Sequence, residues 1–320
     1  MVAERRLHFA TEGSTLVTRV AAIDCGTNSI RLLIADVDSR NFREIYRTME
    51  IVRLGQGVDK NKEFHPDAIE RTLTATRNFS SEIARRGVTK IRFCATSATR
   101  DAKNRDLFID GVHTILGVKP EVISGVEEAH LSFMGATREL HHSDSPFLVI
   151  DIGGGSTEFV FGDSEVRAAK SQNIGCVRMS ERHFTSAPPS KSEIDAATAD
   201  IDQAIKDAAK EVPITEARSL VAVAGTATTV AAAALALEAY DRNAIHVSRI
   251  SASATHHISQ AFLSKTRSEL AALGYMHPGR VDVIAAGSLV LDRIMFHTGA
   301  DEFIASESDI LDGMAWSLAN

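Results

Sequence analysis

Residues Ile150–Phe161 read IDIGGGSTEFVF, three consecutive glycines between two acidic residues with an apolar run on each side. Glycine is needed where the backbone takes angles closed to bulky residues or where another group approaches it closely. A second stretch, Ile23–Ile34 (IDCGTNSIRLLI), repeats the pattern: Asp24 and Asp151 are 127 positions apart, and the Ile, Gly and Ser of both copies match at the same offset. The sequence therefore predicts two copies of one hairpin, each with a glycine-containing turn.

The same order of elements follows each hairpin. After the first copy, the pattern predicts a third strand over Phe42–Leu54 and a helix beginning at Pro66, and then strands and helices alternate. After the second copy, a helix is predicted from about Ser190 to Lys210, because its apolar residues recur at helical spacing. This order predicts two α/β lobes around mixed sheets, with the cleft between the lobes as the expected site.

The length of 320 residues also favours two domains, since one ordinary domain has about 100 to 200 residues. The polar stretch HHSDSPF, His141–Phe147, has the composition of a linker. We therefore assign residues 1–140 to the first lobe and 141–304 to the second. The tail 305–320 has a helical pattern and is a candidate to pack back on the first lobe.

The composition is that of an ordinary globular protein, with 44% hydrophobic and 24% charged residues, and it excludes disordered and fibrous classes. No run is long enough for a membrane span, and the N-terminus lacks the apolar stretch of a signal peptide, so we predict a cytoplasmic protein without a membrane partner. A net charge of −7 argues against nucleic-acid binding. Cys25, Cys94 and Cys176 lie far apart in predicted strands, which favours reduced, buried thiols.

The two glycine turns are expected to bind phosphate, because converging amide N–H groups form a nest for an anion. Asp24 and Asp151 end the strands that lead into these turns. A carboxylate beside a phosphate requires a divalent cation between them, and Mg²⁺ takes one or two carboxylates together with phosphate oxygens. The alternative is that the glycines only allow tight turns, but two matched turns favour a ligand.

Six segments of the chain resemble, in their order, the exopolyphosphatase and guanosine pentaphosphatase (Ppx/GppA) family of the actin, sugar kinase and Hsp70 superfamily. They are AAIDCGTNSIRLLIADV, CATSATRDAKN, VISGVEEAHLSFMGA, VIDIGGGSTEFVFG, NIGCVR and AVAGTATTVAA, and the resemblance extends over about residues 18 to 320. It implies two duplicated ribonuclease H-like lobes, each with a mixed five-stranded sheet and flanking helices, and an active-site cleft between them.

The segment SGVEEAHLSFMGA contains two adjacent glutamates with different expected tasks. Ser124 and Glu127 fit a capping box, which explains Glu127 as part of a helix start. Glu128 points about 100° away, toward a largely apolar face where an unpaired acid is costly. A carboxylate at the rim of the helix is the alternative. The resemblance implies that Glu128 positions and deprotonates the attacking water.

The resemblance also implies roles for other charged residues. Arg100 matches the family's arginine that meets the phosphate, and Glu158 supports the metal ion and the nucleophile. From the pattern alone, Glu158 alternates with phenylalanines in a strand, so exposure to solvent is the alternative. Asp151 and Asp24 are the other expected metal ligands, with Mg²⁺ as the metal and a monovalent cation such as K⁺ as a second candidate.

The remaining expected site residues bind phosphate oxygens. Arg31 aligns with Glu158 between the two copies, which places it in the same cleft. The others belong to the two turns and offer amide, hydroxyl or carboxamide donors: Asn28, Ser29, Gly153, Gly154, Gly155, Ser156 and Thr157.

The leading hypothesis for function is an exopolyphosphatase that hydrolyses the terminal phosphate of short inorganic polyphosphate chains, because the acidic balance offers no long basic track. The second is hydrolysis of guanosine pentaphosphate to the tetraphosphate. A third is a non-catalytic sensor of guanosine polyphosphates, against which Glu128, Asp151 and Glu158 argue. The resemblance further implies a homodimer.

Overall fold

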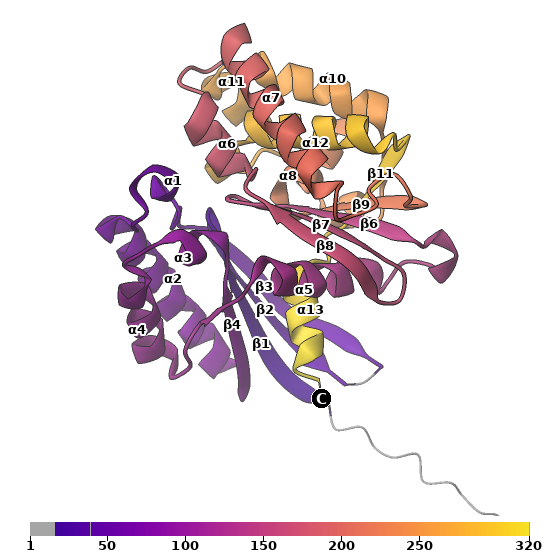
Figure 1. Cartoon of the computed structure of the whole chain (residues 1–320). Helices are drawn as coiled ribbons and strands as arrows, with labels where there is room; N and C mark the ends of the chain where they lie inside the picture. The colour runs from indigo at the N-terminus through magenta and orange to yellow at the C-terminus, as the bar shows by residue number, and fades with distance from the viewer. Residues whose placement is uncertain (1–16, 39, 320) are drawn as a thin grey trace, which may run out of the picture.

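The computed structural model describes residues 17–38 and 40–319, and these form two α/β lobes (Figure 1). The first lobe is built on a mixed sheet with the strand order β3-β2-β1-β4-β5. Its strands are β1 (Thr18–Cys25), β2 (Ser29–Val37), β3 (Phe42–Ile51), β4 (Lys90–Ala95) and β5 (Glu121–Val122). The first three strands form an antiparallel meander, and β4 and β5 continue the sheet parallel to β1.

The second lobe repeats this topology on a sheet of order β10-β11-β9-β6-β7-β8. Its strands are β6 (Phe147–Ile152), β7 (Thr157–Gly162), β8 (Val166–Gln172), β9 (Ser219–Val223), β10 (Arg249–Ser251) and β11 (Glu302–Ala305). The sheet has one strand more than the expected five, because the short β10 adds antiparallel to the edge of β11. The duplicated, two-lobed α/β fold is confirmed.

The helices flank the two sheets or lie where the lobes meet (Figure 1). In the first lobe these are α1 (Val58–Asn61), α2 (Pro66–Arg85), α3 (Ser97–Asp101) and α4 (Arg105–Leu116). In the second lobe they are α6 (Cys176–His183), α7 (Lys191–Ala208), α8 (Ala224–Ala234), α9 (Arg242–Ile245), α10 (Ala252–Leu263), α11 (Arg267–Ala271) and α12 (Ile284–Thr298). Short 3₁₀ turns lie at His142–Asp144 and Pro278–Arg280.

The predicted helix starts are confirmed, and each has a local cause. Helix α2 begins with Pro66, whose missing N–H costs nothing in a first turn, and His65 accepts a hydrogen bond from the backbone N–H of Asp67. Helix α7 begins with a complete capping box between Ser190 and Glu193. The buried residues of α7 recur on one face and pack against the second sheet: Ala197, Ile201, Ile205 and Ala208.

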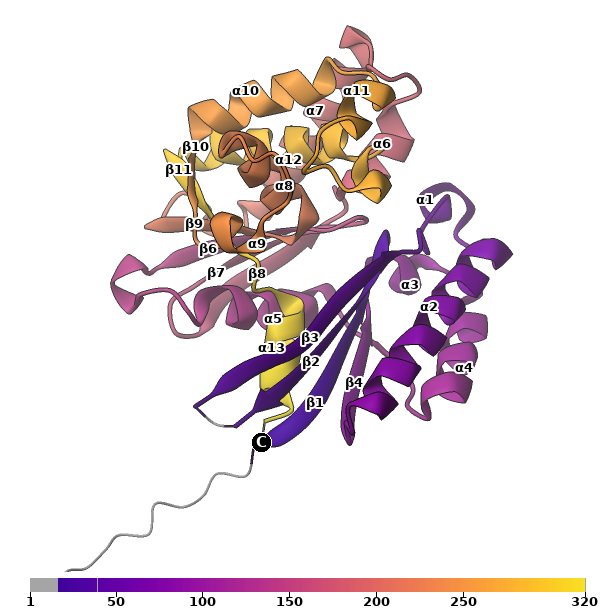
Figure 2. The same ribbon diagram turned by 180° about the vertical axis from the view of Figure 1, so that it is seen from behind.

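Two further helices, α5 (Gly125–Thr137) and α13 (Ile310–Ser317), lie between the two sheets (Figures 1 and 2). Ala129 and Phe133 of α5 pack on the inner face of the second sheet. Leu131 of the same helix joins a core formed by α13 and the first sheet. The C-terminal helix thus packs against strands β1 and β2 and against α5, although about 170 residues separate α5 from it in the chain.

One strand prediction is wrong. Cys176 does not lie in a strand but is the first residue of α6, because β8 ends at Gln172 and the chain turns through Gly175. All three cysteines are buried and free, as expected. Within the described residues, no helix combines the length and the apolar character needed to cross a membrane. The segment 1–16, on which the signal-peptide prediction rests, lies outside the described residues.

Candidate active site

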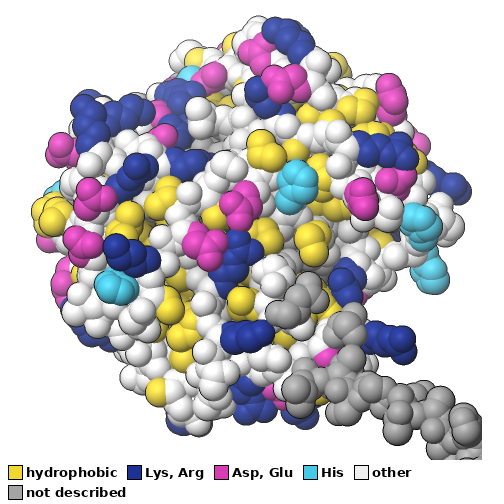
Figure 3. All heavy atoms as spheres, turned by 60° about the horizontal axis from the view of Figure 1, so that its bottom comes forward, with side chains coloured by type: hydrophobic (Ala, Val, Ile, Leu, Met, Phe, Trp, Pro, Cys, Tyr) yellow, Lys and Arg dark blue, Asp and Glu magenta, His cyan; other side chains and the backbone are white. Residues whose placement is uncertain are grey.

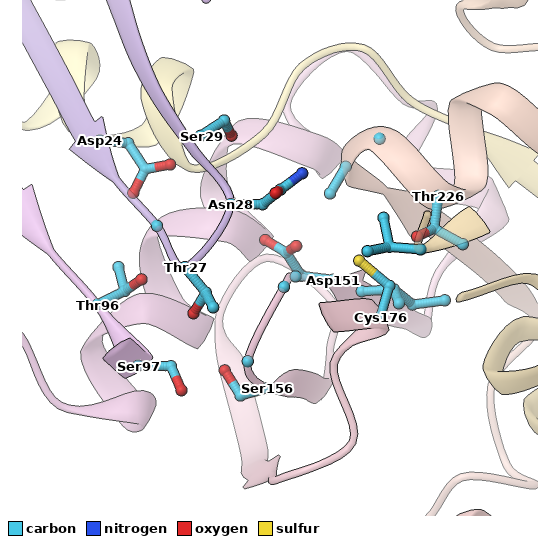
Figure 4. A pocket seen from close by; sticks show the side chains of 18 of the residues that line it. Asp24, Thr27, Asn28, Ser29, Thr96, Ser97, Asp151, Ser156, Cys176 and Thr226 are labelled. Carbon is cyan, nitrogen blue, oxygen red and sulfur yellow. The ribbon is translucent and has the colours of Figure 1, made fainter. Parts of the chain in front are cut away.

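The two glycine turns face each other from opposite lobes (Figure 4). A Cβ atom placed on Gly154 would stand 2.9 Å from the Cβ of Thr27 and 3.2 Å from the backbone N of Asn28. A Cβ atom on Gly155 would stand 2.6 Å from Oγ1 of Thr27. The glycines of the second turn are therefore required because the first turn approaches them directly, and a side chain on either would push the two lobes apart.

A cavity of about 100 Å³ lies at this junction. Most of the site residues predicted from the sequence line it: Asp24, Asn28, Ser29, Arg31, Glu128, Asp151, Gly153, Gly154, Gly155 and Ser156. The fold brings them together from both lobes and from α5: they lie on the hairpin of β1 and β2, on α5, and on β6 with the turn that follows it.

Helix α6 orients the backbone of the second turn. The carbonyl of Gly153 accepts a hydrogen bond from the N–H of Cys176 at 2.9 Å, and the carbonyl of Gly154 accepts from Val177 at 2.8 Å. With these carbonyls turned to the helix, the amide N–H groups of Gly154 and Gly155 have no hydrogen-bond partner among the described residues. They are free to bind an anion, as in other backbone nests.

The two hairpins place an acid opposite a different partner in each copy. Asp24 pairs across the first hairpin with Arg31, which donates to Oδ2 of Asp24 from Nε at 3.0 Å and from Nη2 at 2.7 Å. Asp151 pairs across the second hairpin with Glu158. The duplicated position therefore holds an ion pair in the first lobe and two acids in the second.

Two hydroxyl groups donate hydrogen bonds to the carboxylates of Asp151 and Glu158. Ser132 of α5 donates to Oδ2 of Asp151, and Ser171 of β8 donates to Oε1 of Glu158 at 2.7 Å. Glu158 is only 1% exposed, so the predicted alternative of a solvent-facing side chain is wrong. Its Oε2 atom is buried without a hydrogen-bond partner, which is a costly arrangement for an ionised carboxylate.

Burial and mutual repulsion raise the pKa values of the acids at this site. Burial raises the pKa of Glu128 to about 7, against the opposing effect of Arg100, and the charges of Asp151 and Asp24 raise it further. Burial likewise raises the pKa of Asp151 to about 6. The pKa of Glu158 lies well above its usual range, first through burial and then through the charges of Glu128 and Asp151. Such clusters of perturbed acids in a cleft are typical of functional sites.

The adjacent glutamates of α5 point in different directions as predicted, but the capping box predicted for Glu127 is only half formed. Ser124 caps the helix by accepting from the N–H of Glu127 at 3.1 Å, but the Glu127 side chain turns outward to Arg92 at 2.6 Å. Glu128 is 9% exposed and lines the cavity, and Nη1 of Arg100 donates to its Oε2 at 2.7 Å. Arg100 also donates to the carbonyl of Ile123 at 3.0 Å, so its guanidinium is held against both groups.

Three predicted residues do not line the cavity. Arg100 binds Glu128, which lines the cavity. Glu158 lies opposite Asp151 in the second hairpin, and Asp151 lines the cavity. The hydroxyl of Thr157 donates to the carbonyl of Ile174 at 3.1 Å, in a wholly buried position. The Thr157 side chain thus fixes the end of the turn, whereas Ser156 of the same turn borders the cavity.

Asp309 is a further residue near the site that the sequence pattern does not predict. This residue caps the N-terminus of α13, where it forms a capping box with Asp312, and its side chain also accepts a hydrogen bond from Nη1 of Arg31. Arg31 is therefore bound to two carboxylates, one from the first hairpin and one from the end of the chain. The pattern D-x-x-D in DILDG is a signal for the cap, but it carries no information about a partner 278 positions away.

The donor set fits a magnesium ion without a preformed cage. Within the described residues, no group of three His, Cys, Asp or Glu side chains is close enough to hold a metal. Mg²⁺ needs only one or two carboxylates when phosphate and water complete its shell. Asp24 and Asp151 each use Oδ2 for their hydrogen bonds, and Glu158 has an unpartnered oxygen behind them.

The fold and the site define a protein of two duplicated α/β lobes, with glycine turns and buried acids around a small cavity between the lobes. The chain belongs to the Ppx/GppA phosphatase family, whose model matches residues 33–320. This confirms the family predicted from the six segments.

Individual relatives cover the chain almost completely. It is 46% identical to Exopolyphosphatase 2 of Mycobacterium tuberculosis, over 95% of this chain and 99% of that protein. It is similar to the crystal structure of an exopolyphosphatase-like protein, with a TM-score of 0.92, 44% identity, and coverage of 94% of this chain and 97% of that one. The PPX-GPPA enzyme of Aquifex aeolicus has a TM-score of 0.79 and 27% identity, with 94% of this chain and all (100%) of that chain covered.

Proposed function

We propose that this protein is an exopolyphosphatase, a hydrolase that transfers the terminal phosphoryl group of inorganic polyphosphate to water. The observation that carries this conclusion is the pair of facing turns, with free amides on one side and the ion pair of Arg100 with the buried Glu128 beside them. The relative named Exopolyphosphatase 2 supports the same activity, because its 46% identity extends over 95% of this chain.

The residues present supply what phosphoryl transfer requires, namely positioning and charge stabilisation. The amides of Gly154 and Gly155 bind oxygens of the terminal phosphate, and they arrive already oriented by α6. Glu128 orients a water molecule and accepts its proton, for which a pKa of about 7 is well suited at neutral pH. The water oxygen forms the new bond to phosphorus, and the shortened chain leaves as the bridging P–O bond breaks.

Arg100 has a supporting role in this scheme. It holds Glu128 in place through the 2.7 Å bond, and it favours the ionised form that can take a proton.

We propose Mg²⁺ as the cofactor, held by Asp151 and Asp24 with support from Glu158. A magnesium ion bound there supplies positive charge that neutralises the phosphate oxygens and the repulsion among the buried acids. K⁺ remains a second candidate for a cation in the cleft. The raised pKa values of Asp151 and Glu158 support a cation site, because these acids lack enough positive partners within the protein itself.

Short chains are the expected substrates. On the face in Figure 3, lysine and arginine side chains are interspersed with acidic ones and form no continuous basic track. The net charge of −7 adds a general repulsion toward a long polyanion.

Guanosine pentaphosphate is the second candidate substrate, favoured by one observation. A cavity of about 460 Å³ adjoins the first and shares Arg31, Met49 and Arg280 with it. It is lined in part by aromatic side chains, Tyr240 and Tyr275, which are suited to contact a base. The sensor hypothesis uses the same cavity without turnover.

Phosphate release from purified protein tests these alternatives. The substrates are tripolyphosphate, longer polyphosphates and guanosine pentaphosphate, each with and without Mg²⁺. We expect Mg²⁺-dependent release that is fastest from short polyphosphates. Turnover of the pentaphosphate alone would favour the second candidate, and tight nucleotide binding without any release would favour the sensor.

A matched pair of variants tests the assignment of the base. Glu128→Ala is expected to lower kcat by roughly 10²- to 10⁴-fold, the usual contribution of a general base. Glu127→Ala is the control, because that neighbouring side chain is exposed and bound to Arg92. Full activity in Glu128→Ala would refute the mechanism.

The homodimer and the cytoplasmic location also remain predictions, as does the absence of a nucleic-acid partner. Light scattering of the purified protein in solution tests the first of these.

A further inference from the structure

Arg178 belongs to the segment NIGCVR, to which the proposed mechanism assigns no task. It lies in the first turn of α6 and is 6% exposed. Its Nε donates to the carbonyl of Gly155 at 2.6 Å. The carbonyls of Gly153 and Gly154 bind backbone N–H groups of the same helix, so Arg178 extends this support to the last glycine of the phosphate-binding turn.

The far end of the same guanidinium reaches the other lobe. Nη2 donates to Asp101 at 2.6 Å and lies 3.4 Å from the hydroxyl of Ser97, and Nη1 donates to Asp59. Asp101 and Ser97 belong to α3, the short helix that also carries Arg100. One side chain from the second lobe thus contacts both the phosphate-binding turn and the helix that presents Arg100 to Glu128.

Neighbouring contacts also join the two lobes here, between residues 57–59 and α6, and we call this contact region the seam. Glu181 accepts a hydrogen bond from the backbone N–H of Gly57 at 3.1 Å, and Arg182 pairs with Asp59 at 3.2 Å. The space left among these residues is only about 10 Å³. The seam is therefore closely packed in this arrangement of the lobes.

Burial makes the contacts of Arg178 conditional on lobe closure. A guanidinium removed from water is tolerated when carboxylates pair with it, and is costly when they do not. Both carboxylates that pair with Arg178, Asp59 and Asp101, come from the first lobe, whereas the carbonyl of Gly155 comes from the second. Opening the seam would separate Arg178 from both ionic partners at once. The Arg178 side chain would then no longer be fixed, and the turn would lose its support at the Gly155 carbonyl.

We propose that Arg178 is a positioning residue of the hydrolytic reaction. It fixes the second phosphate-binding turn in register with α3, so that the turn amides and the Arg100–Glu128 pair reach their working positions together, in the closed arrangement of the lobes. This inference rests on the proposed function and adds to it a link between closure and the assembly of the site.

The test compares Arg178→Lys and Arg178→Ala with Arg293→Ala. Lysine keeps the positive charge but cannot donate to the turn and to two carboxylates in the planar geometry of a guanidinium. Arg293 is a matched control, since it forms a bidentate pair with Asp202 at 2.7 and 3.0 Å on the outer helices of the second lobe. Its loss should lower stability without moving the turn.

We expect kcat on tripolyphosphate to fall by roughly 10- to 100-fold in Arg178→Lys, because small misplacements of reacting groups have effects of this size. Arg293→Ala should keep the parent kcat. Amide hydrogen exchange of residues 153–156 should become faster in Arg178→Lys than in the control, and this readout does not depend on turnover.

Unchanged kcat and unchanged exchange in both Arg178 variants would overturn the inference, as would an equal loss in Arg293→Ala. If Arg178→Ala does not fold, Asp101→Asn replaces it, and a decrease in kcat is again expected. A parent protein that releases phosphate from neither polyphosphate nor guanosine pentaphosphate refutes the proposed function instead, and the exchange comparison then decides on Arg178 alone.

Discussion

At the scale of single residues, the proposed chemistry depends on acidic side chains that are buried in the folded protein. Asp24 and Asp151 occupy the same position in the two hairpins, yet one faces Arg31 and the other faces Glu158. The first pair is neutral in sum, whereas the second pair repels and so attracts a cation or a proton. Divergence at one position of a duplicated hairpin therefore gives Asp24 a positive partner within the protein and leaves Asp151 beside a second acid.

Glu128 should reduce stability at alkaline pH. Its pKa of about 7 in the folded protein exceeds its ordinary value of 4.5, so folding favours the protonated form. The stabilisation is complete below pH 4.5 and is lost as the pH rises through 7, with a total of about 3 kcal/mol. We expect Glu128→Gln to have a higher Tm than the parent at pH 8 and a similar Tm at pH 5, measured by thermal denaturation.

The exposed neighbour provides the control for this effect. Glu127→Gln removes a carboxylate that is bound to Arg92 at the surface. It should not raise Tm at pH 8. An equal gain in both variants would mean that net charge, and not the burial of Glu128, is responsible.

Arg100 should set the pH range of activity. Its charge and its hydrogen bond oppose the effect of burial on the pKa of Glu128. Removal of the guanidinium in Arg100→Ala therefore raises that pKa, and a base with a higher pKa is protonated over a wider range. The acidic limb of kcat/KM against pH should move upward. Arg77→Ala, which removes an exposed arginine paired with Glu70, should leave the profile in place.

At the scale of elements, the close contact between α5 and α13 holds several site residues in place. Two glycines allow them to touch: a Cβ on Gly135 would stand 1.8 Å from the carbonyl oxygen of Asp309, and one on Gly313 would stand 2.0 Å from that of Leu131. Helix α5 carries Glu128 and Ser132, and α13 carries Asp309. Their contact thus connects the base, the acid Asp151 and the partner of Arg31.

Gly313→Ala is expected to destabilise the protein by at least about 1–3 kcal/mol, because the obstacle is a backbone oxygen that cannot rotate away. It should also lower kcat/KM, since α13 would move Asp309 away from Arg31. Urea unfolding and steady-state kinetics measure the two effects.

A second glycine in a helix serves as the comparison. The nearest atoms to a Cβ on Gly111 of α4 would be carbons at the end of the Leu73 side chain, and alanine favours a helix by about 1 kcal/mol over glycine. Gly111→Ala should be close to neutral for stability and activity. A Gly313→Ala protein as stable and active as this one would contradict the assigned role of the α5 and α13 contact.

At the scale of the whole molecule, the two lobes are joined through their hydrophobic cores as well as at the cleft. Helix α5 contributes Phe133 to the core of the second sheet and Leu131 to the core formed by the first sheet and α13. The chain also returns from β11 of the second lobe into α13 on the first. Neither lobe therefore has a complete core without a segment that the other one holds.

The protein should unfold as one unit. We expect a single calorimetric transition whose van't Hoff and calorimetric enthalpies agree, because exposing either sheet also exposes the helices between them. Two resolved transitions would show that the lobes are independent. Addition of tripolyphosphate and Mg²⁺ should raise Tm, since a ligand bound between the lobes stabilises only the folded form.

Local pattern was sufficient for much of the fold. The 127-residue offset of the two hairpins, the helix starts at Pro66 and Ser190, and the different directions of Glu127 and Glu128 were all predicted. Each depends on interactions among neighbours in the chain, such as alternation, capping and helical periodicity. The family resemblance then placed the acids and glycines in one cleft.

Contacts between distant segments could not be predicted in this way. The bond of Asp309 to Arg31, the burial of Glu158, the sixth strand β10 and the reach of Arg178 to Asp101 all join segments whose separation carries no local signal. The sequence by itself determined which groups this protein has for holding and hydrolysing a phosphate chain. Only the tertiary structure decided which acids face a cation and which face each other, because that depends on packing between two sheets and on the removal of water from the space between them.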